Sequence, residues 1–558
     1  MKRLTVSTAL LTSLALGLVP ALAGCSGERP VAPSDRAAGA SGATGASAGA
    51  AGGASPVRGG RLVYGLGADA AGFNPVTDQF AAVSYSMAGT IIETLVGVTA
   101  TGEWKPVLAE SLTPSRNADE WTIKVRPGIT FSTGEPLDGR TVKANLEAQK
   151  ASPLTSAAFT PVGSFELVDP MTVKVKLTGP WVAFPYHLAA QIGMVVPPSS
   201  LADPEAASRK PVGTGPFVFK EYTPGSRMVV TRNPAYWRKG LPYLDEVEFR
   251  ILPDTQTRAQ TLEAGGIDAM GTTRDDDILK FGALKDVYTV KRAAGMSVPE
   301  YMFMLNTAAP PFDDLRLRRA LAHATDRAAV ISTLRGGLTE EADGPWSKDS
   351  GWYAPGGGYP AYDLERAKAL IAEVEAEKGQ VSFEVITPPD PNTMQGIELA
   401  QDMWRKAGVE VRIRQVDQAD LVNRAVTGDF QATVWTQFSA ADPDGEYVWM
   451  HQNYAGPVGS IALNFSRLKD LRLSQALDTG RSNPQDDVRK QAYATVQQRL
   501  RELVPYVFVD HLSTGAVIAK TKVGGIGEHL LPDGDKGVPL TGAPIPYHPF
   551  SQVWVGNP

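Results

Sequence analysis

Residues that could carry catalytic or metal chemistry are few and scattered in this chain. The six histidines show no HExxH motif or similarly paired spacing, so they predict no zinc site. From residue 56 onward no G-x-S-x-G nucleophile motif occurs. The Gly-Leu-Gly run at 65–67 begins a match to the dinucleotide-binding pattern, but Asn-Pro at 74–75 stops the helix that this pattern requires. The acidic segment 442–446 lacks the ligand spacing of a calcium loop. The sequence therefore predicts a protein that is not an enzyme and indicates no cofactor and no metal.

Cys25 is the one cysteine in the sequence, and it ends an N-terminal export signal. Two basic residues precede an uncharged, mostly apolar stretch at 4–19, which is too short to span a bilayer comfortably. The run Leu-Ala-Gly-Cys at 22–25 resembles the bacterial lipobox, in which the thiol receives a diacylglycerol and becomes the new N-terminus. We therefore expect residues 1–25 to be a lipoprotein signal peptide with Cys25 as the lipidation site.

The composition of residues 26–55 does not support folding. From 37 to 55 the chain contains only Ala, Gly, Ser and Thr. Such a segment cannot bury enough apolar surface to offset the entropy of ordering it. As a flexible coil of about thirty residues it would span roughly 30 Å. We expect a disordered tether that holds a folded body away from a membrane.

The rest of the chain has the composition of a multi-lobed globular protein. The full sequence is 43% hydrophobic and 20% charged, with a formal net charge of −6. Mild acidity without a Lys/Arg-rich face argues against nucleic acid as a partner. The 42 prolines and 55 glycines indicate many loops rather than a helical bundle. About five hundred residues imply more than one lobe.

An alternation of strands and helices is clearest in the segment 381–436. Apolar patterning predicts, in chain order, a strand at 381–387, a helix at 393–407, a strand at 409–415, a helix at 419–426 and a strand at 430–436. Strands separated by single helices predict a mostly parallel sheet with helices on its faces. The sequence thus predicts an α/β protein.

Further elements follow from caps and breaks. Asp313 and Asp314 can cap a helix that runs to Gly336, and Asp363 can open a helix that stops at Gly379. A long helix is predicted at 485–503, with a strand at 506–509 after it. Residues 101–180 differ from the segment with alternating strands and helices: short strands are predicted at 121–125 and 171–177, between turns.

Several sequence runs resemble the family 5 extracellular solute-binding proteins, the oligopeptide- and dipeptide-binding group. The matching runs are IIETL at 91–95, LAES at 108–111, WTIKVRPGITF at 121–131, GEPL at 134–137, PVGTGPF at 211–217, RNPAYW at 232–237, PYLD at 242–245 and PFDDLRLRRAL at 311–321. They occur in the family's order and extend over nearly all of the chain after residue 60. The glycines and the Asn-Pro turn in these runs serve architecture, and Tyr236 and Trp237 are expected to pack rather than to bind.

The resemblance implies a large two-lobed periplasmic-binding-protein fold with an additional α+β subdomain and a ligand cleft between the lobes. The implied parts are lobe I at 56–100, 211–297 and 511–558, the extra subdomain at 101–210, and lobe II at 298–510.

The loop after the strand at 430–436 is the expected place for ligand specificity, because ligands of open α/β sheets gather beyond the carboxyl ends of strands. In the family's peptide binders, a carboxylate three residues before the Asp-Pro pair holds the peptide α-ammonium; that position is Ser439 here. A register shift is possible, since the family's usual tryptophan is displaced by one residue in Trp435. Asp442 is either a substitute ligand contact or a turn residue. Trp435 and Phe438 are either walls of the pocket or core.

Further contacts are suggested elsewhere in the chain. By the same resemblance, Ala82 and Val83 lie where the ligand backbone makes main-chain hydrogen bonds. Trp346, in a glycine- and aromatic-rich loop, either lines the cleft or packs.

The resulting expectation is a lipid-anchored substrate-binding protein, held at the outer face of the cytoplasmic membrane. It would capture a small solute, foremost a di- or oligopeptide, and deliver it to the permease and ATPase of an ABC transporter. A monomer is expected. The alternatives are a non-peptide ligand such as an oligosaccharide or metal chelate, and a ligand sensor that does not transport.

Overall fold

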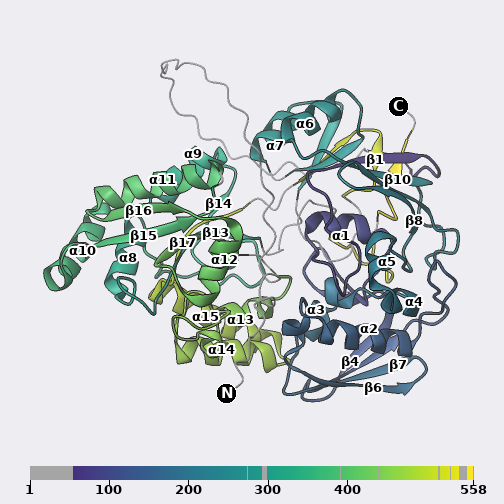
Figure 1. The fold of residues 1–558 in the computed structure, drawn as a ribbon, viewed down its shortest axis with the longest axis horizontal. Coiled ribbons are helices and arrows are strands. Elements are labelled where there is room, and N and C mark those ends of the chain that lie inside the picture. Colours follow the sequence, from purple (N-terminus) through teal and green to yellow (C-terminus); the bar gives the residue numbers. More distant parts are fainter. Residues whose placement is uncertain are drawn as a thin grey trace, which may run out of the picture.

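The computed structural model shows three large sheets, each with its own helices, and two two-stranded ribbons (Figure 1). It describes residues 55–272, 274–291, 298–389, 391–437, 440–512, 516–527, 529–538 and 550–556. We call the body around the seven-stranded sheet lobe I, the body around the six-stranded sheet lobe II, and the body around the four-stranded sheet the small subdomain. Every helix within this described part is too short or too polar to cross a bilayer.

Lobe I collects its strands from three distant parts of the chain. Its sheet has the order β12 (Val287–Lys291), β19 (Ala516–Lys520), β11 (Ala269–Thr272), β1 (Arg61–Leu66), β10 (Glu246–Ile251), β9 (Arg227–Arg232) and β8 (Phe217–Thr223). β1 pairs in parallel with β10 and β11, and the remaining pairs are antiparallel. The helices α1 (Ala82–Ala88), α6 (Thr255–Glu263) and α7 (Asp275–Gly282) belong to this body, as does a short ribbon of β20 (Val523–Gly524) and β21 (Trp554–Val555). Because distant segments meet in one sheet, this lobe cannot form until most of the chain exists.

Lobe II contains the predicted strand–helix alternation. Its sheet has the order β14 (Glu340–Glu341), β18 (Tyr506–His511), β13 (Glu300–Leu305), β17 (Ala432–Gln437), β15 (Ser382–Thr387) and β16 (Glu410–Gln415). The predicted parallel arrangement is confirmed for β15, β16 and β17. It is wrong for the sheet as a whole, since β13, β14 and β18 pair antiparallel. β13 and β18 do not belong to the series of strands that are joined by single helices. They lie where the chain passes between lobe II and lobe I, so their connections do not require parallel pairing.

Lobe II has the helices α8 (Leu315–Ala324), α9 (Arg327–Arg335), α10 (Leu364–Lys378), α11 (Pro391–Lys406), α12 (Gln418–Thr427), α13 (Tyr447–Met450), α14 (Leu471–Ser482) and α15 (Asp486–Leu503). Of these, α10, α11, α12 and α15 begin and end close to their predicted limits, whereas α13 and α14 were not predicted. Asp314 and Asp363 cap α8 and α10 as predicted, accepting hydrogen bonds from backbone amides. The single helix predicted up to Gly336 is wrong, because a second cap, Asp326, starts α9 after a break.

The small subdomain is an antiparallel sheet covered by a helix. The strand order is β4 (Ala109–Pro114), β5 (Glu120–Val125), β7 (Thr172–Leu177) and β6 (Val162–Asp169). Around it lie α2 (Gly139–Ala151), α3 (Phe184–His187), α4 (Pro198–Ala202), α5 (Pro204–Arg209) and the ribbon of β2 (Val96–Val98) and β3 (Trp104–Pro106). Alternating apolar residues of β5 and β7 face its core.

Three of the family-like sequence runs meet at the buried carboxylate of Glu93. Tyr236 donates its hydroxyl proton to one oxygen over 2.8 Å. Trp237 and Thr214 donate to the other oxygen over 2.7 and 2.9 Å. Glu93 is fully buried, and a buried carboxylate is tolerated only when such donors satisfy it. These runs therefore hold parts of the fold together, as the sequence suggested for Tyr236 and Trp237.

Two chain crossings join lobe I to lobe II. The chain passes from β12, ending at Lys291, to β13, beginning at Glu300, and returns from β18, ending at His511, to β19, beginning at Ala516. Two adjacent connections of this kind are typical of a hinge between lobes.

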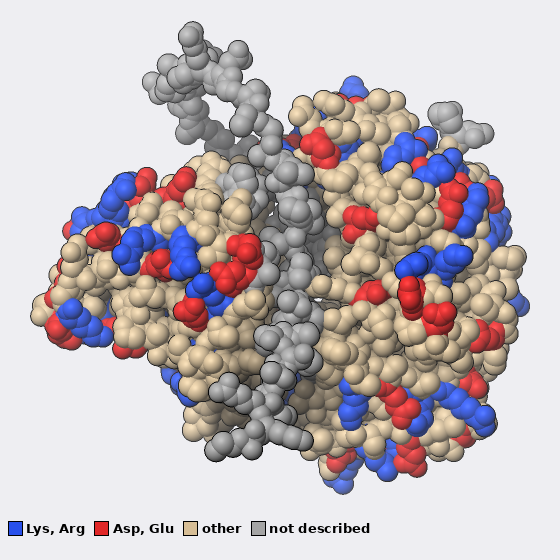
Figure 2. Space-filling model, viewed as in Figure 1, with Lys and Arg blue, Asp and Glu red and all other residues tan. Residues whose placement is uncertain are grey.

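The surface carries charges of both signs. Over the face seen in Figure 2, acidic and basic side chains are interspersed on lobe I, lobe II and the small subdomain.

Candidate functional site

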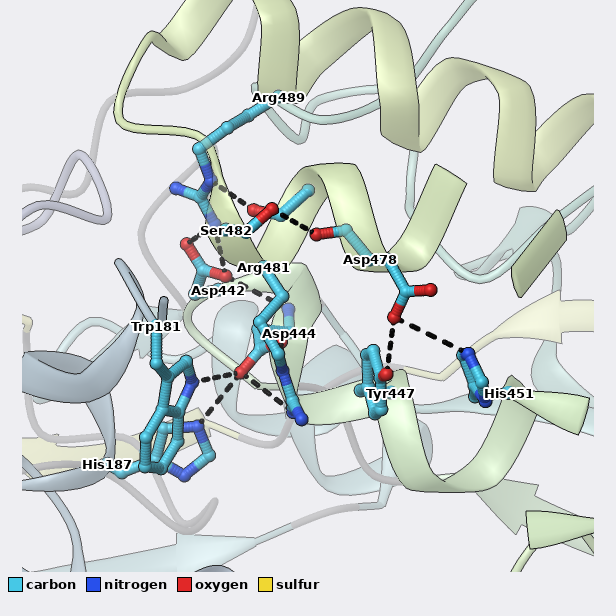
Figure 3. Close-up of polar contacts among 11 residues, drawn as sticks. Trp181, His187, Asp442, Asp444, Tyr447, His451, Asp478, Arg481, Ser482 and Arg489 are labelled. Atoms are coloured by element: carbon cyan, nitrogen blue, oxygen red, sulfur yellow. Dashed lines mark hydrogen bonds and ion pairs between the residues drawn. The ribbon is translucent and has the colours of Figure 1, made fainter. Parts of the chain in front are cut away.

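After β17, Ala441 packs against the core of the small subdomain, and the chain continues into the short turn η3 (Pro443–Glu446) and α13. Asp442, which the sequence offered as a ligand contact, is only 2% exposed. Arg489 from α15 donates to both of its carboxylate oxygens over 2.7 Å (Figure 3). The Asp444 amide donates to the same carboxylate over 2.9 Å. Burial raises the pKa of Asp442, while the charge of Arg489 opposes that rise. Asp442 thus already has a cationic partner, and its role as a ligand contact stays a prediction.

Asp444 ties lobe II to the small subdomain. Its carboxylate accepts hydrogen bonds from Trp181 over 2.6 Å and from Arg481 over 2.6 and 3.1 Å, and His187 Nε2 lies 3.5 Å away (Figure 3). Burial alone would raise the pKa of Asp444, but the charge of Arg481 and the hydrogen bonds hold it below its ordinary value. Asp444 therefore stays ionised and joins two bodies that belong to distant parts of the chain.

Arg481 is held between aromatic rings at this contact. Its guanidinium carbon lies 3.5 Å from the centroid of Tyr447 and 5.6 Å from that of Trp181. Tyr447 in turn donates to Asp478 over 2.5 Å, and it stacks on His451 with centroids 4.8 Å apart. Stacking and ion pairing together fix the planar guanidinium in one orientation. The contact between lobe II and the small subdomain is thus specific in geometry as well as in charge.

A small cavity of about 10 Å³ lies along β13 in lobe II, among the side chains of Glu300, Met302 and Met304 and those of the segment 446–465. Two carboxylates line it, from Glu300 at the start of β13 and Glu446 at the end of η3, and they are 1% and 4% exposed. Burial raises the pKa of Glu446 to about 8, and burial and the neighbouring Glu446 raise that of Glu300. Gln437 Nε2 donates to Glu446 over 3.0 Å. Sequence reasoning missed this pair, although an acidic residue heading the apolar strand 300–305 was a signal.

Neutralising Glu446 is expected to make stability less sensitive to alkaline pH. A folded-state pKa of about 8 exceeds the ordinary 4.5, so the folded protein retains this proton where the unfolded chain has lost it. The resulting stabilisation is complete below the unfolded pKa and disappears as pH rises through the folded pKa. Urea unfolding between about pH 5 and pH 9 should show wild type losing on the order of a few kcal/mol more than Glu446→Gln. Equal losses would contradict this assignment.

The other predicted ligand contacts are distributed over both lobes. Ala82 and Val83 begin α1 in lobe I and are half-buried. Trp435, on β17, is also half-buried; its ring lies 5.3 Å from Phe465, and its Nε1 donates to Gln437 over 3.2 Å.

Trp346 is 2% exposed and lies 5.6 Å from the ring of Tyr493 in the lobe II core. Phe438, Ser439 and Cys25 lie outside the described residues. The binding roles of all these residues stay predictions. Within the described residues no three or more His, Cys, Asp or Glu side chains are grouped to hold a metal ion.

Comparisons with known proteins agree on one family. A profile described as bacterial extracellular solute-binding proteins, family 5 (middle region), matches residues 103–458. The glutathione-binding protein GsiB of Salmonella paratyphi A is 26% identical over 424 residues, which cover 73% of this chain and 81% of the relative. The dipeptide-binding protein of Escherichia coli is 25% identical over 514 residues, which cover 86% and 94%.

The fold also has a close counterpart among solved structures. The periplasmic binding protein DppA of Helicobacter pylori, in complex with the peptide STSA, superposes with a TM-score of 0.74 at 22% identity, covering 90% of this chain and 99% of that one. The likeness confirms the predicted two-lobed periplasmic-binding-protein fold. Since the family match extends over more than half of the sequence, the chain belongs to the family 5 bacterial extracellular solute-binding proteins.

Proposed function

We propose that this protein captures a peptide between lobe I and lobe II and delivers it to the permease and ATPase of an ABC importer. The observation that carries the proposal is the paired crossing between two sheet-based lobes, in a fold shared with a peptide-bound, ABC transporter-associated protein over 90% of the chain. Relatives named for glutathione and dipeptide binding support a short peptide as ligand. The activity is binding followed by release, without catalysis, and the protein acts as a monomer.

The direct test is to identify what the protein carries. The full chain is purified in mild detergent without denaturation, then unfolded, and the released small molecules are analysed by mass spectrometry. A mixture of short peptides, absent from a mock purification, is the expected result. A single sugar, chelate or other non-peptide species would overturn peptide capture and retain solute binding.

We also propose that the protein is anchored to the outer face of the cytoplasmic membrane by a lipid on Cys25, with residues 26–55 as the tether. The support is the lipobox-like run at 22–25 and the absence of large apolar residues from 37 to 55. Together, a lipid anchor and a flexible tether would keep the folded body near a permease without restricting its rotation.

Cys25→Ala is expected to move the protein from the membrane fraction to the soluble extracellular or periplasmic fraction, because the thiol that would accept the lipid is gone. Peptide affinity should be unchanged, since the tether separates Cys25 from the folded body. Fractionation with immunoblotting, together with calorimetry on the released protein, checks both statements. Continued membrane association would contradict the lipid anchor, and lost affinity would contradict the tether.

A further inference from the structure

A pocket of about 520 Å³ opens on the surface of lobe II between α8 and α10. The two helices pack against each other, and α10 lies at the end of lobe II farthest from lobe I in Figure 1. A third wall is the segment 358–361, which precedes α10. The volume is within the range of small-molecule sites, about 300–1,000 Å³. Because the pocket belongs to one lobe, it is separate from the space between the lobes.

Helical spacing brings cationic side chains of both helices to this pocket. On α8, Arg316, Arg319 and His323 follow one another at intervals of three and four residues. On α10, Arg366 and Glu373 are seven residues apart. Side chains at such intervals lie on one face of a helix. The lining thus contains three arginines and a histidine, and Glu373 is its one carboxylate.

The third wall is fixed by hydrogen bonds to the rest of lobe II. His323 Nδ1 lies 2.7 Å from the carbonyl oxygen of Ala361. Since a carbonyl oxygen only accepts, this nitrogen is the donor. The hydroxyl of Tyr359 donates to the carbonyl oxygen of Tyr506 over 3.1 Å and accepts from the Phe508 amide over 2.7 Å. The pocket is therefore formed in advance, and a ligand would not have to order it.

Two of the three arginines have no carboxylate partner. Arg316 is already paired with Asp314 and Glu377. Within the described part of the chain, the Arg319 side chain makes one hydrogen bond, from Nε to a carbonyl oxygen near the end of α15 over 3.3 Å, and the Arg366 side chain makes no hydrogen bond or ion pair. A free guanidinium presents donors in a planar fork that matches a carboxylate or a phosphate. Arg319 and Arg366 can both bind such a group.

The neighbouring Arg318 shows how an arginine with a structural role is placed here. It is 5% exposed and donates to the carbonyl oxygens of Leu503 and Phe312 over 2.9 and 2.7 Å. Arg319 is only half-buried, and its two terminal nitrogens have no partner among the described residues. Fold stability thus accounts for the position of Arg318 and leaves the terminal donors of Arg319 unexplained.

The remaining lining residues supply apolar surface next to these charges. They include Leu315, Leu370, Pro360 and the ring of Tyr359. Glu373 is exposed and has no ion pair with any described residue. Its negative charge would repel an anion in the pocket, whereas the two unpaired guanidinium groups would attract it. The balance of the unpaired charges favours an anion that also has an apolar part.

We propose that this pocket is a second binding site of the protein, for a small organic anion whose carboxylate or phosphate groups are held by Arg319 and Arg366. The site goes beyond peptide capture and does not depend on it. Carboxylates and phosphates share the charge and the oxygen geometry that a guanidinium recognises. The probes of the experiment distinguish these two sources of negative charge.

Titration calorimetry on the full chain in mild detergent tests the proposal with inorganic pyrophosphate and with citrate. Both titrations are made at the same low ionic strength, because salt screens charges near the surface. At least one probe should bind with a stoichiometry of one and a dissociation constant below about 1 mM. Tighter binding of pyrophosphate would identify a phosphate ligand, and tighter binding of citrate a carboxylate ligand.

Arg319→Gln and Arg366→Gln should each weaken binding of the preferred probe by about fivefold or more, because each removes a charged donor. Glu373→Gln should strengthen binding by about twofold or more, since it removes the repelling charge. Arg412→Gln is the matched control. It changes the net charge equally, but Arg412 is exposed on β16 and lies outside the lining of the pocket. Thermal unfolding verifies the fold of each variant.

The proposal is overturned if neither probe binds with a dissociation constant below about 1 mM. It is also overturned if Arg319→Gln and Arg366→Gln bind the preferred probe as Arg412→Gln does, because the affinity would then reflect overall charge or another site. Should an arginine variant fail to fold, Glu373→Gln keeps the test decisive: an unchanged affinity in this variant contradicts binding in the pocket. Peptide capture is unaffected by any of these results.

Discussion

Arg489→Met is expected to lower the free energy of unfolding by about 3–5 kcal/mol, because it leaves the Asp442 carboxylate buried without its cation. Both groups are nearly inaccessible, with side chains 6% and 2% exposed. Arg489 also donates to the carbonyl oxygen of Gly480 over 2.8 Å, which joins α14 to α15. Its guanidinium lies 4.9 Å from the ring of Trp352. Urea unfolding, followed with a spectroscopic probe in lobe II, measures the loss of unfolding free energy as a shift of the transition midpoint.

A double substitution isolates the charge from the packing. Asp442→Leu in the Arg489→Met background removes both ions and should recover a large part of the lost stability, since replacing a buried ion pair by apolar residues is often neutral. Arg405→Met, which breaks the exposed ion pair with Asp402, is the control and should change little. If Arg489→Met were as mild as the control, the Asp442 carboxylate would have to be neutral in the folded protein.

Asp444→Asn is expected to open the contact between lobe II and the small subdomain. The substitution keeps the shape of the side chain and removes the charge that faces Arg481 and His187. Removing one partner of a buried, hydrogen-bonded charge pair costs about 2–5 kcal/mol. The arrangement in which lobe II contacts the small subdomain is then less populated without ligand, so the ligand must supply the energy that restores this contact. Peptide affinity should therefore fall by about tenfold or more.

Small-angle X-ray scattering and calorimetry together check this expectation. The ligand-free variant should have a larger radius of gyration than wild type, and saturating peptide should reduce the difference. Asp478→Asn is the matched control, because among the described residues the side chain of Asp478 bonds only with Tyr447 and His451, both inside lobe II (Figure 3). An unchanged radius and affinity, with lower stability alone, would show that Asp444 serves local packing and not the contact between bodies.

Local signals in the sequence predicted much of lobe II correctly. Asp363 and Gly379 delimit α10 as expected, since a side-chain cap and a glycine act on the backbone next to them. The strands β15, β16 and β17 and their helices appear in order, because apolar periodicity reflects burial within each element. The direction of β13 and β18 was not predicted, because pairing between strands from remote parts of the chain leaves no periodic signal.

The sequence by itself determined the family and the fold class, and it provided the expectation of an export signal. All three depend on residue order and on patterns within short segments. Only the tertiary structure decided the partners of the charged residues. Asp442 meets Arg489 across 47 positions, and Asp444 meets Trp181 across 263. Glu300 and Glu446 share a cavity for the same reason. The partner of a charge is set by how distant elements pack, and the residues next to it in the sequence carry no record of that packing.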